Sequence, residues 1–262
     1  MTESVVLSRA GSVATVRIAR PERLNALDVT AFRQLRESLE ALGRDPTARA
    51  VILTGTDPAF CAGGDVAAMD SERAAGTLGR FFHDLTGEQE LSVRAIMTMP
   101  KPVLAQVNGV AAGGGLSLAL ACDWRIAAAS AKLVPAFPTL GAVPDGGLTY
   151  LLPHFLGIGL AQELLFTAAQ VPADRARELG LLHEVVPREQ LDDRCAARAT
   201  ELAAGPTFAY GWMKRLMVSA FSGSLESQLA LERQGAVEAA SRNELPEGIR
   251  AFREKRRPRF PG

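Results

Sequence analysis

Short apolar runs alternate with amphipathic stretches through most of the chain. Residues 5–8 and 13–19 flank a turn at Ala10 and Gly11, which predicts a hairpin. Other short apolar runs are typical of buried strands, and they lie at residues 50–54, 103–107 and 124–128. Apolar positions with helical spacing predict helices at residues 28–43, 77–99 and 115–121.

The pattern changes in the last third of the chain. From about residue 172 the strand signal nearly ends, and residues 183–186 are its last candidate. Four helices are predicted after it, at residues 188–204, 207–221, 225–241 and 245–255. Strands separated by helices favour a parallel sheet covered on both faces. The sequence therefore predicts an α/β core followed by a helical C-terminal part.

Two glycine clusters stand between predicted strands and predicted helices, at residues 60–65 (FCAGGD) and 108–115 (NGVAAGGG). Glycine permits a positive φ and the close approach of another group. A helix start leaves N–H groups without intrahelical partners. Two such turns side by side would aim two N–H groups at one point, as in an oxyanion hole or an anion cradle.

Either cluster alone is equally consistent with close packing of a helix on a strand. A dinucleotide-binding fold is disfavoured, because no G-x-G-x-x-G opens the first strand–helix unit. No G-x-x-x-x-G-K-[ST] run for a nucleoside triphosphate is present either. The meaning of the clusters depends on the residues around them.

Composition narrows the class of protein. The chain has 262 residues, 47% of them hydrophobic, which is ample for one large domain with or without a small appendage. Basic and acidic residues balance at 29 each, which argues against nucleic acid or an anionic membrane as a partner. Three cysteines without metal-ligand spacing, and no evident signal peptide or membrane span, favour a cytoplasmic protein without a metal site.

The glycine clusters belong to a longer series of motifs. In order these are residues 20–27 (RPERLNAL), 59–65 (AFCAGGD), 101–109 (KPVLAQVNG), 113–115 (GGG), 121–127 (ACDWRIA), 140–144 (LGAVP), 176–182 (ARELGLL) and 252–256 (FREKR). Over essentially the whole chain, the series resembles the crotonase superfamily, the enoyl-CoA hydratase/isomerase family. The resemblance implies an α/β core built as a crotonase-like spiral of ββα units, residues 1–200, and a helical trimerisation region, residues 201–262. It also implies assembly as a homotrimer or a dimer of trimers.

Members of this family bind an acyl-CoA thioester and hold its carbonyl oxygen with two backbone N–H groups. By matched position, those groups belong to Gly64 and Gly114. Removing a proton beside a thioester places negative charge on that oxygen, and one preplaced donor is typically worth about 3 kcal/mol. Coenzyme A is then part of the substrate, and the resemblance implies no other cofactor.

The resemblance also suggests where the rest of the substrate binds. Arg23 matches a basic position beside the CoA channel, and Lys255 matches a basic segment that reaches CoA phosphates from a neighbouring subunit. A solvated basic surface is the alternative for both. The other substrate-binding candidates are Ala26, Ala62, Asp65, Val66, Gly113 and Phe137.

The sequence departs from the hydratase pattern at the catalytic acids. Hydratases of the family carry two glutamates, whose positions are occupied here by Ser117 and Phe137. Serine is a poor base without a partner, and phenylalanine takes no proton. Hydration by the usual route is therefore not expected.

Asp145 is the acidic residue that remains in this region. The isomerase branches carry an Asp or Glu at about this place, and one carboxylate can move a proton from one carbon to another. Apolar neighbours such as Phe137 are expected to raise its pKa. We therefore expect an enoyl-CoA isomerase with Asp145 as proton shuttle. The alternative for Asp145 is a helix N-cap.

Other functions remain open at this stage. One is a hydratase with an atypical acid/base, for which Glu90 is the first suspect. Another is dehalogenation or thioester hydrolysis, with Asp145 as nucleophile and His83 or Glu90 assisting. For both residues, a solvated helix face is the simpler interpretation. A third is a CoA-binding scaffold that has lost catalysis. Whether Ser117 assists is also open.

Overall fold

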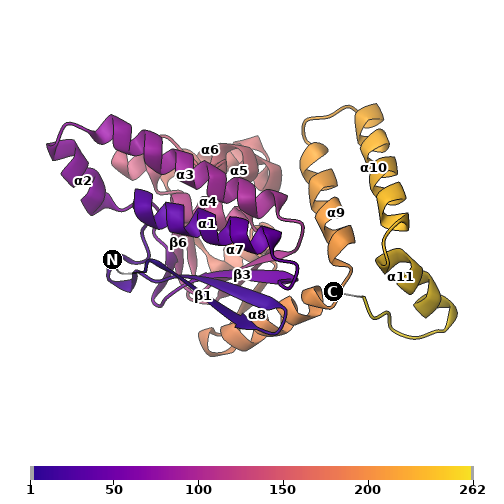
Figure 1. Cartoon of the computed structure of the whole chain (residues 1–262). Helices are drawn as coiled ribbons and strands as arrows, with labels where there is room; N and C mark the ends of the chain where they lie inside the picture. Colours follow the sequence, from indigo (N-terminus) through magenta and orange to yellow (C-terminus); the bar gives the residue numbers. More distant parts are fainter. Residues whose placement is uncertain (1–2, 261–262) are drawn as a thin grey trace.

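The computed structural model describes residues 3–260. Residues 1–2 of the first predicted unit and residues 261–262 of the second lie outside it. Its larger sheet has six strands in the order β1-β2-β3-β5-β7-β10 (Figure 1). The pair β1–β2 is the predicted hairpin, and the remaining neighbours are parallel. The strands are β1 (Val5–Ala10), β2 (Val13–Ile18), β3 (Ala50–Gly55), β5 (Val103–Val107), β7 (Trp124–Ala128) and β10 (Glu184–Val186). The predicted parallel sheet is therefore confirmed.

A second sheet has four strands in the order β4-β6-β8-β9. They are β4 (Ala59–Cys61), β6 (Val110–Ala112), β8 (Lys132–Val134) and β9 (Val171–Pro172). The apolar pattern does not predict them, because strands of two or three residues are too short to show a period. The apolar pattern suggests that each glycine turn directly follows a long buried strand. In the structure the turns instead follow the short strands β4 and β6.

The chain repeats one unit along these two sheets. A strand of the larger sheet is followed by a short strand of the second sheet and then by a helix. The repeats are β3-β4-α2, β5-β6-α4 and β7-β8-α5, with helices α2 (Val66–Ala74), α4 (Gly114–Ala121) and α5 (Leu148–Leu156). This repetition is the spiral of ββα units that the resemblance implies.

Helices cover both faces of the larger sheet (Figure 1). On one face lie α1 (Val29–Arg44) and α3 (Leu78–Thr98), and on the other lies α8 (Arg188–Ala203). The side chain of Asp28 caps α1, and the helix buries its apolar stripe completely at Phe32, Leu35 and Leu39. Each such side chain contributes roughly 1.5–3 kcal/mol through burial. The shorter elements are η1 (Pro21–Arg23), η2 (Phe137–Leu140), α6 (Ile158–Thr167) and α7 (Ala173–Glu178).

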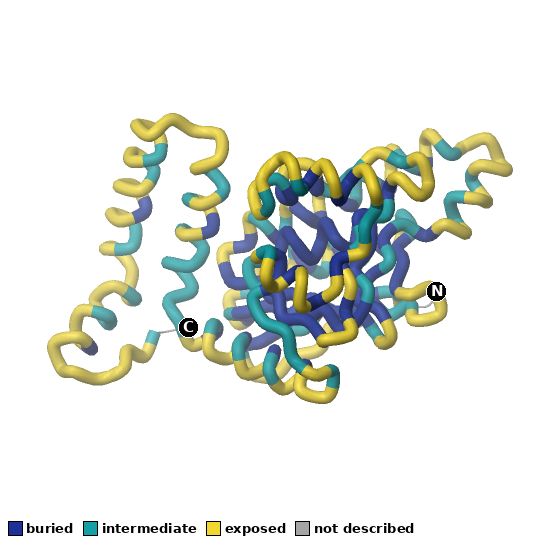
Figure 2. The backbone as a smooth tube through the Cα atoms, turned by 180° about the vertical axis from the view of Figure 1, so that it is seen from behind, coloured by how far each residue is buried: buried dark blue, intermediate teal, exposed yellow. Residues whose placement is uncertain are grey.

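The last three helices stand apart from the sheets (Figure 1). They are α9 (Thr207–Ser219), α10 (Leu225–Ala240) and α11 (Glu244–Arg253), close to the predicted bounds. Most residues of α10 and α11 are exposed, whereas most residues of α9 are partly buried (Figure 2). The helical C-terminal part is thus confirmed, while the division at residues 200 and 201 stays a prediction. Between residues 3 and 260, none of the helices is long and apolar enough to span a membrane.

Candidate active site

The two glycine turns lie side by side because the strands before them are neighbours. β4 and β6 pair in parallel, with Ala59 opposite Val110, so both strands end at the same edge of the small sheet. Gly63 has φ +93°, and a Cβ atom built there would lie 3.1 Å from the backbone nitrogen of Gly114. The expected juxtaposition of the turns is therefore present.

Gly64 and Gly114 each keep a backbone N–H group free for another partner. Around Gly64, the N–H of Leu27 donates to Gly63 O at 2.8 Å, and the N–H of Asp65 donates to Leu27 O at 3.0 Å. Gly114 is the first residue of α4, where an N–H group has no intrahelical acceptor. Within residues 3–260, neither N–H donates a hydrogen bond. Both glycines line one pocket.

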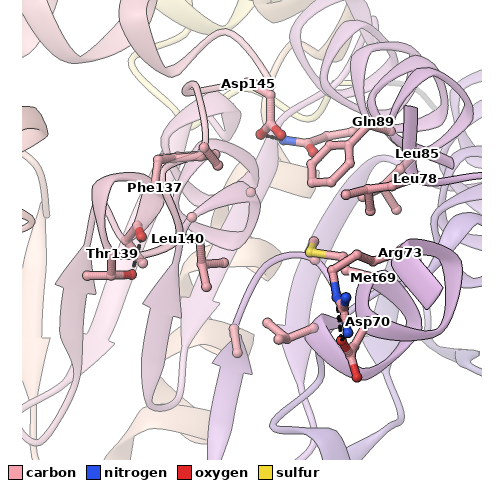
Figure 3. A pocket seen from close by; sticks show the side chains of 18 residues that line it. Met69, Asp70, Arg73, Leu78, Leu85, Gln89, Phe137, Thr139, Leu140 and Asp145 are labelled. Carbon is pink, nitrogen blue, oxygen red and sulfur yellow. Dashed lines mark hydrogen bonds and ion pairs between the residues drawn. The ribbon is translucent and has the colours of Figure 1, made fainter. Parts of the chain in front are cut away.

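This pocket has a volume of about 490 Å³ and a mainly apolar lining (Figure 3). Helices α2 and α3 form one side, and η2 with the turn after it forms the other. Its apolar side chains include Val66, Met69, Leu78, Phe82, Leu85, Phe137 and Leu140. Two carboxyl groups of the described residues line it. Asp70 pairs with Arg73 at 2.8 Å, and Asp145 lies on the far side of the pocket (Figure 3).

Asp145 lies in the turn between η2 and α5. The N-cap of α5 is Gly147, and no side chain caps this helix, so the N-cap interpretation of Asp145 is wrong. Its Oδ1 atom instead accepts a hydrogen bond of 2.8 Å from Nε2 of Gln89 (Figure 3). Burial raises the pKa of Asp145, and the hydrogen bond from Gln89 opposes that shift. The carboxyl group thus has the environment expected of a general base.

Ser117 supports the same turn through its backbone. Its hydroxyl donates to the carbonyl oxygen of Asp145 at 3.0 Å, and the side chain is fully buried in α4. Phe137 is also buried, and its ring would lie 3.9 Å from a Cβ atom at Gly113. The two positions that carry glutamates in hydratases therefore hold a backbone support and an apolar wall.

Gln89 is the residue of this site that the motifs do not reveal. It is 2% exposed and belongs to the buried stripe of α3 with Phe81, Leu85, Val93 and Ile96. The sequence does carry a signal, because Gln89 is a polar residue at an apolar position of a regular helical stripe. A buried amide needs hydrogen-bond partners, so such a residue marks a polar contact inside the fold.

Comparison with known proteins decides the family. The family model for enoyl-CoA hydratase/isomerase matches residues 8–262. The chain belongs to the enoyl-CoA hydratase/isomerase family. It is 40% identical over 268 residues to the 1,2-epoxyphenylacetyl-CoA isomerase of Escherichia coli (strain K12), with 100% of both chains covered. It is 32% identical over 264 residues to the crotonyl-CoA hydratase of Syntrophomonas wolfei, with 98% of each covered.

Solved structures agree with this assignment. An enoyl-CoA hydratase from Polaromonas sp. JS666 superposes with a TM-score of 0.92 at 33% identity, covering 98% of this chain and 99% of that one. The crotonase fold expected from the motifs is therefore confirmed. Some relatives of the chain are named isomerases and others hydratases. Family membership alone therefore does not show which reaction this protein catalyses.

His83 and Glu90 lie outside the candidate active site. Both are exposed on α3, and the Glu90 carboxylate lies 3.9 Å from the guanidinium of Arg94. They line a separate depression on the outer side of the turn at Gly146. The solvated-face interpretation is confirmed for both, and Glu90 loses its support as the acid/base of a hydratase.

Asp65 holds the entrance loop together. Its buried carboxylate accepts from the backbone N–H groups of Ala67 and Ala68, which caps α2. The same carboxylate pairs with Arg20 at 3.0 Å and with the half-exposed Arg23 at 3.4 Å. The side chain of Asp65 is therefore used within the fold, and its contribution to CoA binding stays a prediction for its backbone atoms.

The remaining substrate-binding candidates divide into two groups. Ala62, Val66, Gly113 and Phe137 line the pocket, whereas Ala26 is buried beneath the Arg23 loop, its carbonyl oxygen accepting from Arg20 at 2.6 Å. Lys255 follows α11, which lies on the opposite side of the molecule from α2 (Figure 1). It does not reach the pocket of its own chain, so its predicted role requires a neighbouring subunit.

Cys61 lies beside the first glycine turn but is not a candidate nucleophile. Cys61 is fully buried, and burial raises the pKa of its thiol to about 12, which makes it inert. In the part of the chain that the structure describes, no three or more His, Cys, Asp or Glu side chains form a cluster able to hold a metal ion. The pocket thus brings together the backbones of Gly64 and Gly114, the paired Asp70 and the carboxyl group of Asp145.

Proposed function

We propose that this protein is an enoyl-CoA isomerase, which moves a C=C bond of an acyl-CoA thioester by proton transfer. The observation that carries the proposal is the position of Asp145. The carboxyl group of Asp145 lines the pocket beside the turns of Gly64 and Gly114, and the buried amide of Gln89 donates a hydrogen bond to it. The two hydratase glutamate positions are Ser117 and Phe137, so the chain retains a single candidate base there.

The proposed reaction moves one proton and one electron pair in each step. The Asp145 carboxylate removes a proton from the carbon next to the thioester carbonyl of a 3-enoyl-CoA. The electron pair of the broken C–H bond shifts toward the carbonyl oxygen and forms a dienolate, which the N–H groups of Gly64 and Gly114 stabilise. The protonated Asp145 then returns its proton to the γ carbon, which leaves the double bond conjugated with the thioester.

The surroundings of Asp145 favour this shuttle over the addition of water. Apolar side chains, Phe137 among them, border the pocket, and burial raises the pKa of Asp145 toward the range in which a carboxyl group both takes and returns a proton. Hydration needs a second group to activate water. The other carboxyl group of the described pocket lining, Asp70, is exposed and paired with Arg73. The alternatives, an atypical hydratase or an inactive CoA-binding scaffold, therefore rank below isomerisation.

The test is to supply a 3-enoyl-CoA and follow formation of the conjugated thioester. Replacement Asp145→Asn is expected to lower kcat about 10²- to 10⁴-fold, the usual contribution of a general base. Crotonyl-CoA, offered in parallel, is expected to be hydrated poorly or not at all. Full activity in Asp145→Asn would disprove the role of Asp145. Acyl-CoA binding without turnover of any substrate would support the scaffold.

A second candidate reaction is isomerisation of a ring-epoxide acyl-CoA. The observation in its favour is the 40% identity, over the full length of both chains, to a 1,2-epoxyphenylacetyl-CoA isomerase. Phe82 and Phe137 give the pocket aromatic walls on two sides. An aromatic ring-epoxide thioester therefore belongs in the same assay panel as linear 3-enoyl-CoA substrates, and the ratio of the two kcat/KM values ranks the two reactions.

We further propose a homotrimer or a dimer of trimers, located in the cytoplasm and using no metal or redox cofactor. The helices α9–α11 support the assembly, because they expose many large apolar side chains. These are Met213, Met217, Phe221, Leu225, Leu229, Val237, Leu245, Ile249 and Phe252. Apolar patches of this extent are typical of protein interfaces. The reaction itself needs proton transfer and charge stabilisation, which the chain's own groups can supply.

A further inference from the structure

Gln89 contacts both halves of the candidate site. Its Nε2 atom donates to Oδ1 of Asp145 at 2.8 Å. A Cβ atom at Gly114 would lie 3.0 Å from both Nε2 and Oε1 of Gln89, and one at Gly146 would lie 2.1 Å from Nε2. The amide group therefore fits between the oxyanion turn and the turn of the base, in space that exists because both positions are glycine (Figure 3).

We propose that Gln89 is a positioning residue that engages Oδ1 of Asp145 and leaves Oδ2 as the oxygen that exchanges the proton with the substrate. The inference rests on the proposed function of Asp145. A carboxylate can accept hydrogen bonds at either oxygen, so an unanchored group would present both. Ser117 holds only the backbone carbonyl of this residue. Within residues 3–260, Gln89 is the one side chain that donates to the carboxyl group.

The same contact links the base to the oxyanion donor. Because the amide packs against Gly114, it sets the separation between the N–H of that residue and the carboxyl group of Asp145. In the proposed reaction, one proton leaves the α carbon and returns to the γ carbon while the oxyanion stays in place. A single oriented carboxyl oxygen can serve both carbons only if its position relative to the oxyanion is constant.

Charged groups around Asp145 are few, so the effect of Gln89 can be measured cleanly. Across the pocket, Asp70 and Arg73 of α2 pair with each other. On the outer side of the turn, Glu90 and Arg94 of α3 form an ion pair near the exposed His83. The segments η2 (FPTL) and α4 (GGLSLALA) carry no charged residue, and α5 carries only His154, in its last turn.

The decisive variant is Gln89→Met, which keeps the length of the side chain and removes the amide. We expect kcat to fall roughly 10- to 100-fold, as for a misplaced catalytic group, while KM changes less than about twofold. Loss of a donor to the ionised carboxylate raises its pKa, so the acid limb of the kcat/KM profile moves to higher pH. The matched control is Glu90→Gln, one residue away on α3 and outside the pocket. This variant is expected to leave kcat and the acid limb of the kcat/KM profile unchanged.

A double-variant cycle separates positioning from a merely structural role. In the Asp145→Asn background, Gln89→Met is expected to cause no further loss of kcat, because its effect passes through Asp145. An undiminished kcat and an unmoved acid limb in Gln89→Met would overturn the inference, provided that Asp145→Asn is impaired. Equal losses in both backgrounds would also overturn it. If Asp145→Asn retains full activity, the proposed function fails instead, so the two failures are distinguishable.

Discussion

At the scale of single residues, the proposed role of Asp145 predicts how the activity depends on pH. A general base acts in its charged form, and burial raises the pKa of this carboxyl above the usual Asp value. We therefore expect kcat/KM to fall as the pH drops through that raised pKa, with the acid limb above the ordinary range for Asp. A profile of kcat/KM between pH 4 and 9 at constant ionic strength measures it. A limb at or below the ordinary Asp pKa would contradict the assignment.

The same raised pKa predicts the stability of Asp145→Asn. The folded protein binds this proton more tightly than the unfolded chain does, so an ionised Asp145 lowers the free energy of unfolding above its folded-state pKa. At a pH below the ordinary Asp pKa, Asp145 is protonated in both states and this loss of stability is absent. Asparagine removes the buried charge and can still accept from Gln89, so the Tm of Asp145→Asn at pH 7 should equal or exceed that of the parent. A lower Tm would mean that its lost activity reflects damage to the fold.

Gly146 tests whether the amide of Gln89 needs its space. Gly146 has φ +56° and a Cβ atom there would lie 2.1 Å from Nε2 of Gln89, whereas Gly147 has φ +75° and open space around it. Gly147→Ala should cost about 1–2 kcal/mol of backbone strain. Gly146→Ala should cost more, because its Cβ atom would also lie 2.8 Å from the Cβ atom of buried Ser117. Only Gly146→Ala should also lower kcat, because it displaces Gln89 and crowds Ser117, the two side chains that contact Asp145. Thermal unfolding together with steady-state kinetics compares the two, and equal kcat values in both variants would contradict the packing argument.

Residue types and motifs point to the candidate donors and the candidate base, but not to the residue between them. Gly64, Gly114 and Asp145 stand in or beside recognisable motifs, and the structure brings them to one pocket. Gln89 stands in none, and its partner Asp145 is 56 residues away in the chain. Such a contact depends on how α3 packs over the turn, which spacing along the sequence does not encode. The polar break in the stripe of α3 is its only trace in the sequence.

At the scale of elements, the long strands and helices were predictable, and the second sheet was not. A six-residue strand such as β3 is rich enough in apolar residues to be predicted as a buried strand. The strands β4 and β6 have three residues each, and their pairing brings together segments about fifty residues apart. Their register, which places the two glycine turns side by side, follows from tertiary packing and has no local signal.

One buried cation, Lys214, joins α9 to the core. Lys214 donates to Asp123 at 2.7 Å, to the carbonyl oxygen of Ile96 at 2.8 Å and to that of Lys101 at 3.2 Å. Lys214→Met removes the cation from the Asp123 carboxylate, which then keeps, among the described residues, only the N–H of Val103, at 2.7 Å, as a donor. We therefore expect a loss of about 3–5 kcal/mol in the free energy of unfolding. The control is Arg215→Met, its exposed neighbour, which stacks on the ring of Trp212 and should change stability by about 1 kcal/mol or less. Urea unfolding measures both, and similar values for the two variants would show that Lys214 does not anchor the helix.

At the scale of the whole molecule, the exposed apolar faces of α9–α11 predict association. Phe252 is 85% exposed, and large apolar side chains at this exposure are unusual across three consecutive helices. We expect sedimentation velocity to show trimers or hexamers, and Phe252→Ser to shift the distribution toward smaller species at low protein concentration. A chain that stays monomeric across the micromolar range would contradict the proposed assembly.

Assembly also decides whether Lys255 can contribute to CoA binding. Lys255 follows α11, far from the pocket of its own chain (Figure 1), so it can reach CoA phosphates only at the pocket of a neighbouring subunit. A lysine contact to phosphate is chiefly electrostatic. Lys255→Ala should therefore raise KM for an acyl-CoA about tenfold, the equivalent of 1.4 kcal/mol, and leave kcat unchanged. With an acyl-pantetheine thioester, which lacks the nucleotide phosphates, the same variant should show the parent's KM. Arg233→Ala, an exposed basic residue of α10, is the matched control and should alter neither value. An equal rise in KM for both thioesters would mean that Lys255 acts on the fold or the assembly, and no rise for either would remove it from the binding site.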